Sequence, residues 1–229
     1  MIPFTPIGVI HSCFGEKFGI PRQAGLAPAA TATLELLPPY AMPEAVRGLE
    51  EFSHLWLIFV FHGIPAGQWQ PTVRPPRLGG HQRLGVFATR SPFRPNAIGL
   101  SAVRLERIAI DRGRVTLHLS GVDLLDGTPV LDIKPYLPYA DGLPDAGGGF
   151  AAQAPDAGLT VEFSPEAEAV CAAWPGGELR ELIVQVLSQD PRPAYERGAA
   201  AAQSYGMRLH DREVQWTMHG QIAHVTAIR

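Results

Sequence analysis

Short apolar segments, each ended by Gly or Pro, recur through residues 1–141. The most hydrophobic is Phe52–His62 (FSHLWLIFVFH), which predicts a buried central strand. Thr31–Leu37 (TATLELL) alternates loosely between apolar and polar residues and ends at a Pro-Pro pair, which also predicts a strand. Helix is scarce here, although Pro43–Glu50 has room for two turns. Further strands are predicted at Ile7–His11, Arg83–Ala88, Ser101–Arg107, Val115–Leu119 and Val130–Ile133. Strands this short and closely spaced favour a sandwich or a barrel.

The pattern changes after a linker at residues 142–158, which is rich in Gly, Ala, Pro and Asp and has no periodicity. Ser164 is a good N-cap for a helix that begins at Pro165. Glu178–Ser188 has helical spacing and stops before a proline-rich stretch. The segments Met207–Leu209, Glu213–Met218 and Ile222–Ile228 are predicted strands. We therefore predict a mainly β chain with a β domain at residues 1–141 and a small α+β domain at residues 159–229.

Composition sets limits on the class of protein. Of the 229 residues, 46% are hydrophobic, which suits one large domain or one domain with a small partner. No run reaches the roughly 18–20 apolar residues of a membrane helix, and the N-terminus lacks the pattern of a signal peptide. Two distant cysteines, Cys13 and Cys171, make no disulfide framework. His54 and His62 lack a third ligand at metal spacing. These features predict a cytoplasmic protein with no membrane segment and no metal.

Charge is unevenly distributed, although the net charge is only −3. Between Arg74 and Arg114 the chain has nine arginines against two acids, a net of +7. Between Ser120 and Val170 it has nine acids against one lysine, a net of −8. Such asymmetry can mark a surface for an anion such as RNA. Arginines that pair with acids elsewhere in the fold would give the same pattern, and charge alone favours this second explanation.

The stretch at residues 88–101, ATRSPFRPNAIGLS, interrupts the apolar pattern with a cationic loop. Pro92 and Pro95 disfavour helix at the residues before them and stiffen the path of the chain. Arg90 and Arg94 are then held on a rigid loop, where a guanidinium can bind a carboxylate or phosphate. Asn96 adds an amide donor and acceptor.

Other polar stretches flank predicted strands. Gly19–Pro28 (GIPRQAGLAP) offers donors from Arg22 and Gln23, although an ordinary turn would look the same. His62 and Gly63 follow the central strand, where a histidine either faces a pocket or only caps the strand. Gly121–Tyr139 contains several acids around an Asp-Gly turn, which could hold a cationic ligand or ribose hydroxyls, or could be solvated in a hairpin. There is no Walker loop, GxGxxG, HExxH or GxSxG motif. The residues alone predict a pocket for a small anionic or zwitterionic ligand.

Five of these stretches together resemble one family. PIGVIHS, GIPRQAGLAP, FSHLWLIFVFH, VFATRSPFRPNAIGLS and DLLDGTPVLDIKPYLPYAD match, in order and spacing, the TsaA-like proteins, also called TrmO or VirR-like. The segments LSQDPRPAY and SYGMRLHDREVQW resemble the smaller C-terminal region of the longer bacterial members. The resemblance implies a β-barrel at residues 1–141 that is neither Rossmann-like nor knotted. It also implies a homodimer that uses S-adenosylmethionine to methylate N6-threonylcarbamoyladenosine at position 37 of tRNA, beside the anticodon.

The resemblance also implies which residues contact the cofactor. By motif position these are Pro21, Arg22, Gln23, His62, Gly63, Arg90, Leu100, Asp123, Leu124, Leu125 and Asp126. The set is chemically sensible, since the cofactor has a carboxylate for arginine and a ribose for aspartate. We assign Arg94, Asn96, Lys134 and Arg192 to the substrate, with Arg94 equally able to face the cofactor or a dimer partner.

The proline-stiffened segment DPRPAY supplies the predicted catalytic residues. Arg192 suits the threonyl carboxylate, and Asp190 or Tyr195 could accept the proton of the exocyclic nitrogen across the dimer. A structural turn that ends a helix would explain these residues equally well. The other functions considered are a non-catalytic RNA-binding module and a hydrolase of a small anionic metabolite. The hydrolase is disfavoured because the sequence shows no nucleophile–base pair.

Overall fold

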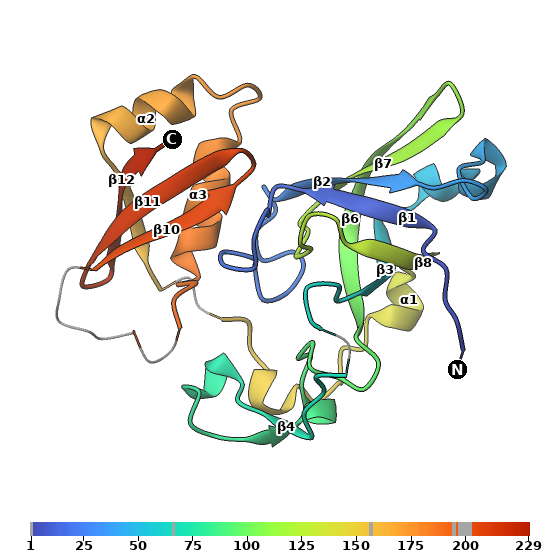
Figure 1. Ribbon diagram of the computed structural model, residues 1–229, viewed down its shortest axis with the longest axis horizontal. Helices are drawn as coiled ribbons and strands as arrows, with labels where there is room; N and C mark the ends of the chain where they lie inside the picture. Colours follow the sequence, from blue (N-terminus) through green and yellow to red (C-terminus); the bar gives the residue numbers. More distant parts are fainter. Residues whose placement is uncertain (1, 66, 156–157, 194–195, 197–202) are drawn as a thin grey trace.

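The computed structural model describes all residues except 1, 66, 156–157, 194–195 and 197–202. Its larger part is a closed barrel in the strand order β1-β2-β7-β6-β3-β8 (Figure 1). The barrel strands are β1 (Gly8–Ser12), β2 (Thr31–Leu36), β3 (His54–Val60), β6 (Ile98–Asp111), β7 (Arg114–Ser120) and β8 (Pro129–Pro135). All neighbouring pairs are antiparallel. The mainly β fold and the barrel are thus confirmed.

Side chains along β3 alternate between the inside and the outside of the barrel. Leu55, Leu57 and Phe59 point into the barrel, with 0%, 0% and 4% exposure, while the residues between them face outward. β3 pairs with β6 on one side and β8 on the other. Gly99 lies opposite Phe59, and the aromatic ring fills the space that a side chain at Gly99 would need.

Two local predictions need correction. Arg83–Ala88 forms only the two-residue strand β5 (Leu84–Gly85), followed by a 3-10 turn at Val86–Ala88. Its partner β4 (Thr72–Val73) is equally short, so no longer ladder can form. The predicted strand Ser101–Arg107 is the middle of β6, whose 14 residues continue past the barrel into a hairpin with β7.

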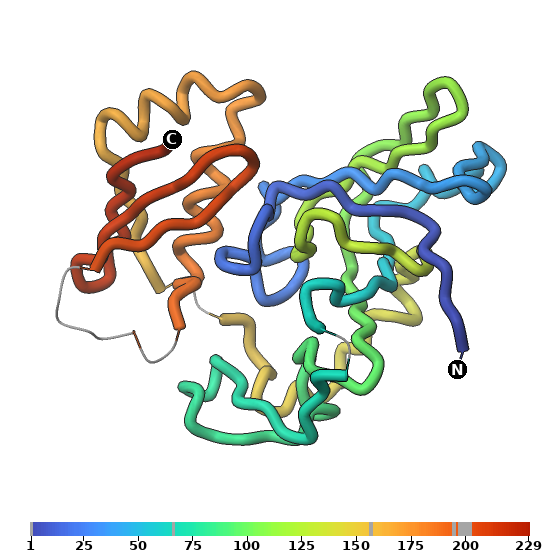
Figure 2. The backbone as a smooth tube through the Cα atoms, viewed as in Figure 1, coloured from blue at the N-terminus to red at the C-terminus, as the bar shows by residue number. Residues whose placement is uncertain are grey.

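Residues 64–65 and 67–97 leave the barrel as an arm that contains β4 and β5 (Figure 2). The expected helical turns at Pro43–Glu50 are the 3-10 turns Pro43–Val46 and Leu49–Glu51. After the short helix α1 (Pro138–Asp141), the chain runs beside the arm, where the guanidinium of Arg77 donates to the carbonyl of Gln153.

The C-terminal part is a sheet in the order β10-β11-β12-β9 with two helices packed on it. Its elements are β9 (Thr160–Phe163), α2 (Pro165–Ala172), α3 (Leu179–Ser188), β10 (Ser204–Leu209), β11 (Arg212–His219) and β12 (Ile222–Ile228). Ser164 caps α2 as predicted, because its hydroxyl accepts from the amide of Ala167 at 3.2 Å. The α+β character of this region is also confirmed.

The two parts share one continuous hydrophobic core. Phe14, in the loop after β1, is fully buried and forms an isolated bridge with Leu209 of β10. The amide of His210 donates to the carbonyl of Cys13 at 2.7 Å. The loop at residues 13–30 therefore connects the barrel to the second sheet. None of the helices in the described part of the chain has the length and apolarity needed to cross a bilayer.

Candidate active site

A cavity of about 520 Å³ lies at one end of the barrel. Its walls come from the loop after β1, the end of β3, the 88–101 loop with the start of β6, and the turn before β8. This volume is within the roughly 300–1,000 Å³ of small-molecule sites. The cavity brings together Pro21, Arg22, Gln23, His62, Gly63, Arg90, Leu100, Asp123, Leu124, Leu125 and Arg94. Segments distant in sequence therefore form one site, as the predicted pocket requires.

The 88–101 loop is braced by its own side chains. The guanidinium of Arg94 donates to the carbonyl of Thr89 at 2.7 Å and to that of Val86 at 3.3 Å. It also lies 5.7 Å from the centre of the Phe87 ring. Arg94 thus lines the cavity but uses its donors to hold the loop. Arg90, in contrast, donates to the side-chain oxygen of Gln23 inside the predicted cofactor set.

Asp123 is the acid of this cavity. Burial raises the pKa of its carboxyl above the ordinary value. Hydrogen bonds from the Ser101 hydroxyl and from backbone amides oppose this shift, as does the positive charge of Arg90. Its Oδ1 atom is buried and has no hydrogen-bond partner among the described residues. A buried acceptor without a donor is costly, so this oxygen is available to a donor on a ligand.

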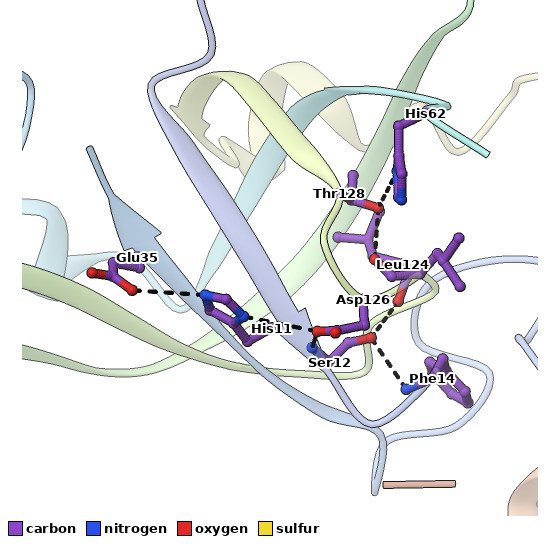
Figure 3. A network of polar contacts seen from close by, with 9 residues as sticks. His11, Ser12, Phe14, Glu35, His62, Leu124, Asp126 and Thr128 are labelled. Carbon is purple, nitrogen blue, oxygen red and sulfur yellow. Dashed lines mark hydrogen bonds and ion pairs between the residues drawn. The ribbon is translucent and has the colours of Figure 1, made fainter. Parts of the chain in front are cut away.

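The turn at residues 124–128 is fastened to β1 (Figure 3). Ser12 donates its hydroxyl to the carbonyl of Leu124 at 2.6 Å, and its amide donates to Asp126 Oδ1 at 3.0 Å. His11 lies 3.9 Å from the same Oδ1 atom and 3.7 Å from Glu35. The Asp126 side chain therefore links the turn to β1 by a hydrogen bond. Unlike the other predicted cofactor contacts, it does not line the cavity.

Thr128 and Lys17 line the cavity although the sequence did not single them out. The Thr128 side chain lies next to His62, with Oγ1 at 3.4 Å from Nδ1. Lys17 Nζ donates to the carbonyl of Gly63 at 2.5 Å. Lys17 comes just before the polar loop at Gly19–Pro28, so proximity to that loop was the only signal that could have identified it.

The remaining predicted residues that the structure describes do not line the cavity. Asn96 is exposed, and Lys134 forms an ion pair with Asp132 at 3.0 Å on the surface of β8. Asp190 and Arg192 follow α3, and neither lines the cavity. Tyr195 lies outside the described residues. Among the described residues, the structure of one chain thus does not bring the predicted catalytic residue Asp190 to the cavity.

Asp190 and Arg192 instead bind each other. Arg192 Nε donates to Asp190 Oδ1 at 2.7 Å, and its terminal nitrogen donates to Oδ2 at 2.9 Å. Arg192 is only 7% exposed, and its guanidinium carbon is 5.8 Å from the centre of the Tyr205 ring. Asp190 has a φ of 50°, a conformation that Asp and Asn tolerate better than most residues. This geometry supports the structural alternative for the pair, while its role toward a substrate stays a prediction.

The arginines of residues 74–114 do not form one patch. Arg74, Arg77 and Arg83 belong to the arm, whereas Arg107 and Arg114 lie on the β6–β7 hairpin, away from the arm (Figure 1). The arm adjoins the cavity through the 88–101 loop, and the hairpin does not line it. Only the first set is therefore placed to contact a molecule bound at the cavity.

The closed barrel with a cationic cavity at its end defines a small-molecule site outside the Rossmann class. The family model of the tRNA-methyltransferase O N-terminal domain matches residues 9–142, and that of the TrmO C-terminal domain matches residues 156–229. The chain belongs to the tRNA-methyltransferase O family, which confirms the resemblance seen in the sequence.

Individual relatives are similar over most of their length. The tRNA (adenine(37)-N6)-methyltransferase of Escherichia coli K12 is 52% identical over 93% of this chain and 92% of its own. A protein of Pseudomonas aeruginosa PAO1, named putative S-adenosylmethionine-dependent methyltransferase RcsF, is 56% identical over 93% of this chain and 90% of its own. A crystal structure of TrmO from P. aeruginosa superposes with a TM-score of 0.80 at 47% identity, covering 100% of this chain and 97% of that one.

The raised pKa of Asp123 predicts a pH-dependent effect of Asp123→Asn on stability. Because the carboxyl is more easily protonated in the folded state, its contribution to stability is largest at low pH. That contribution is lost as the pH rises through the folded-state pKa. The melting temperature of the variant relative to wild type should therefore increase from pH 4 to pH 7.5. Calorimetry at both pH values would measure this, and a difference that does not change with pH would contradict it.

The Asp190–Arg192 pair predicts a large stability effect. Asp190→Ala leaves a buried guanidinium without its carboxylate, which should lower the free energy of unfolding by about 3–5 kcal/mol. Asp190→Asn is the matched control, because it keeps an acceptor and tolerates the positive φ, and it should lose clearly less. Urea unfolding of the three proteins compares them. Equal stability of Asp190→Ala and wild type would refute a structural role for the pair.

Proposed function

We propose that this chain transfers the methyl group of S-adenosylmethionine to N6 of adenine 37 in tRNA, and that the acceptor adenosine carries a threonylcarbamoyl group. The proposal rests mainly on one observation. A chain 52% identical to the E. coli tRNA (adenine(37)-N6)-methyltransferase has a cavity in which segments of four of the five motifs meet. A cytoplasmic location follows from this proposal, because tRNA is its substrate.

The side chains of the cavity suit this cofactor. Arg22 and Arg90 offer guanidinium groups for its carboxylate, and the oxygens of the Asp123–Leu125 turn can accept from ribose hydroxyls. Ile20, Phe59 and Leu100 supply apolar surface for the adenine. When bound, S-adenosylmethionine supplies a methyl group on a positively charged sulfur. The contribution of the protein is to hold acceptor and donor in line and to exclude water.

The tRNA side of the site is formed by the arm. Arg74 and Arg83 lie on the segment that leads into the 88–101 loop, where they can contact phosphates beside the anticodon. A local patch of this kind is sufficient for a stem-loop, which explains how a chain of net charge −3 can act on RNA. The segment with Asp190, Arg192 and Tyr195 stays a candidate tRNA contact. In a dimer, the segment of one subunit would contact the tRNA bound at the cavity of the other.

Incubation with S-adenosylmethionine and tRNA that carries or lacks threonylcarbamoyl, followed by mass analysis of nucleosides, tests the activity. We expect methylation of adenosine 37 only in the modified tRNA. Arg90→Ala should weaken cofactor binding in calorimetry roughly tenfold to a hundredfold, since a charge-assisted hydrogen bond is lost. Arg107→Ala, an exposed arginine on β6 outside the cavity, is the matched control and should bind normally. In the tRNA assay, methylation of both tRNAs would disprove the threonylcarbamoyl requirement. Methylation of neither tRNA would disprove the activity.

We also propose that the protein acts as a homodimer through the outer face of β3 and β6. Ile58 and Leu100 are direct neighbours on this face, and Leu100 is 52% exposed although it is apolar. Trp56 extends the same apolar face. Since Leu100 also lines the cavity, a second copy bound here would cover the cavity's edge.

Ile58→Glu tests the dimer, because a charge buried in an apolar interface costs several kcal/mol. Sedimentation should show a dimer for wild type and a monomer for this variant. Thr33→Glu, on the opposite wall of the barrel, is the matched control and should stay dimeric. A wild-type monomer at all concentrations would rule out the dimer.

A further inference from the structure

The transfer of a methyl group to N6 requires an acceptor for the proton that N6 loses. The titratable side chains that line the cavity are Lys17, Arg22, Arg90, Arg94, Asp123 and His62. The four lysine and arginine side chains are proton donors and not acceptors. Asp123 keeps one oxygen in hydrogen bonds, and its other oxygen is the acceptor that the proposed function gives to a ribose hydroxyl of the cofactor. His62 is exposed at the cavity, so among the described residues it is the base that an acceptor can reach.

The structure also indicates which nitrogen of His62 carries the proton. Thr128 Oγ1 donates to the carbonyl of Leu125 at 2.6 Å and therefore has already used its single proton. The same oxygen lies 3.4 Å from Nδ1 of His62. With its proton directed at Leu125, the hydroxyl can only accept from the ring, which places the ring proton on Nδ1. Nε2 then holds the lone pair, and no described residue donates to it.

Thr128 is itself held firmly. It is 2% exposed, its amide donates to the carbonyl of Leu125 at 3.2 Å, and its carbonyl accepts from the amide of Ile10 at 2.9 Å. The hydroxyl therefore cannot turn away from His62 without leaving the Leu125 carbonyl. A buried hydroxyl with no freedom to rotate is a suitable device for selecting one tautomer of a histidine.

We propose that His62 Nε2 accepts the N6 proton during methyl transfer and that Thr128 is the positioning residue that keeps this nitrogen unprotonated. As the bond between N6 and the methyl carbon forms, the bond between that carbon and sulfur breaks. The sulfonium becomes a neutral thioether with the electron pair of the broken bond. The N6 proton moves to Nε2 and leaves a histidinium, so the positive charge passes from sulfur to the imidazole. The proposal rests on the methyltransferase function proposed above.

His62→Gln, Thr128→Val and Thr128→Ser test the proposal in the full chain with S-adenosylmethionine and threonylcarbamoylated tRNA. His62→Gln should lower the single-turnover rate at saturating cofactor by about 100-fold or more, the usual contribution of a positioned base, whether or not the cofactor affinity also changes. Thr128→Val keeps the shape but lacks the hydroxyl, and should lower the rate about two- to tenfold, as expected for one hydrogen bond. Thr128→Ser restores the hydroxyl and should retain the wild-type rate.

Nitrogen NMR of the His62 ring separates positioning from a merely structural effect. Wild type and Thr128→Ser should show a protonated Nδ1 and an unprotonated Nε2, while Thr128→Val should shift toward the opposite tautomer. A proton on Nε2 in the wild type would overturn the proposal. So would a His62→Gln variant that binds the cofactor weakly but reacts at full rate when saturated, because His62 would then be only a cofactor contact. If the wild type transfers no methyl group, the proposed methyltransferase function is disproved. The nitrogen spectrum of the ring still shows whether Thr128 selects the tautomer of His62.

Discussion

Hydrogen bonds between β1 and the turn at residues 124–128 hold three parts of the molecule in place. The amide of Ile10 donates to the carbonyl of Thr128 at 2.9 Å, and its carbonyl accepts from the amide of Gly127 at 2.8 Å. These bonds place β8 beside β1, where the two strands pair and close the barrel. The amide of Asp126 donates to the carbonyl of Phe14 at 2.9 Å, and Phe14 bridges to the C-terminal sheet. Since buried backbone groups need partners, the barrel, cavity wall and second sheet depend on one set of bonds.

Much of the fold could be predicted because its signals are local. The continuous apolar run identified β3, and the hydroxyl of Ser164 with the proline after it identified the start of α2. The 14-residue length of β6 was missed, because its outer half belongs to a hairpin with few buried residues. The length of β5 was overestimated, because the apolar residues after Gly85 form a 3-10 turn that begins at Val86 and do not pair with another strand. Pairing partners are set by the closed barrel, which no single segment of sequence reveals.

The candidate site was predictable as a set of stretches but not as individual roles. The motifs identified the segments that line the cavity, yet residue type alone did not distinguish Arg90 from Arg94, which braces its own loop. Asp123 and Asp126 lie in one turn, but only Asp123 faces the cavity, because the other side chain accepts from Ser12. Thr128 had no signal at all, since a threonine beside a turn is ordinary. Such roles depend on where a side chain's hydrogen bonds go, and that requires the fold.

The charge of the cavity has a consequence for the order of events. Among the residues that the structure describes, Lys17, Arg22, Arg90 and Arg94 face the cavity with Asp123 as the one acid. S-adenosylmethionine brings one carboxylate but two positive groups, so on its own it adds to the positive charge. Arg94 is partly offset by carbonyl oxygens, which reduces this cost without removing it. If the proposed function holds, an acceptor with a carboxylate or phosphate relieves the repulsion and should bind better when the cofactor is present. A threonylcarbamoyl adenosine in tRNA provides both groups, and an unmodified adenosine provides only the phosphate.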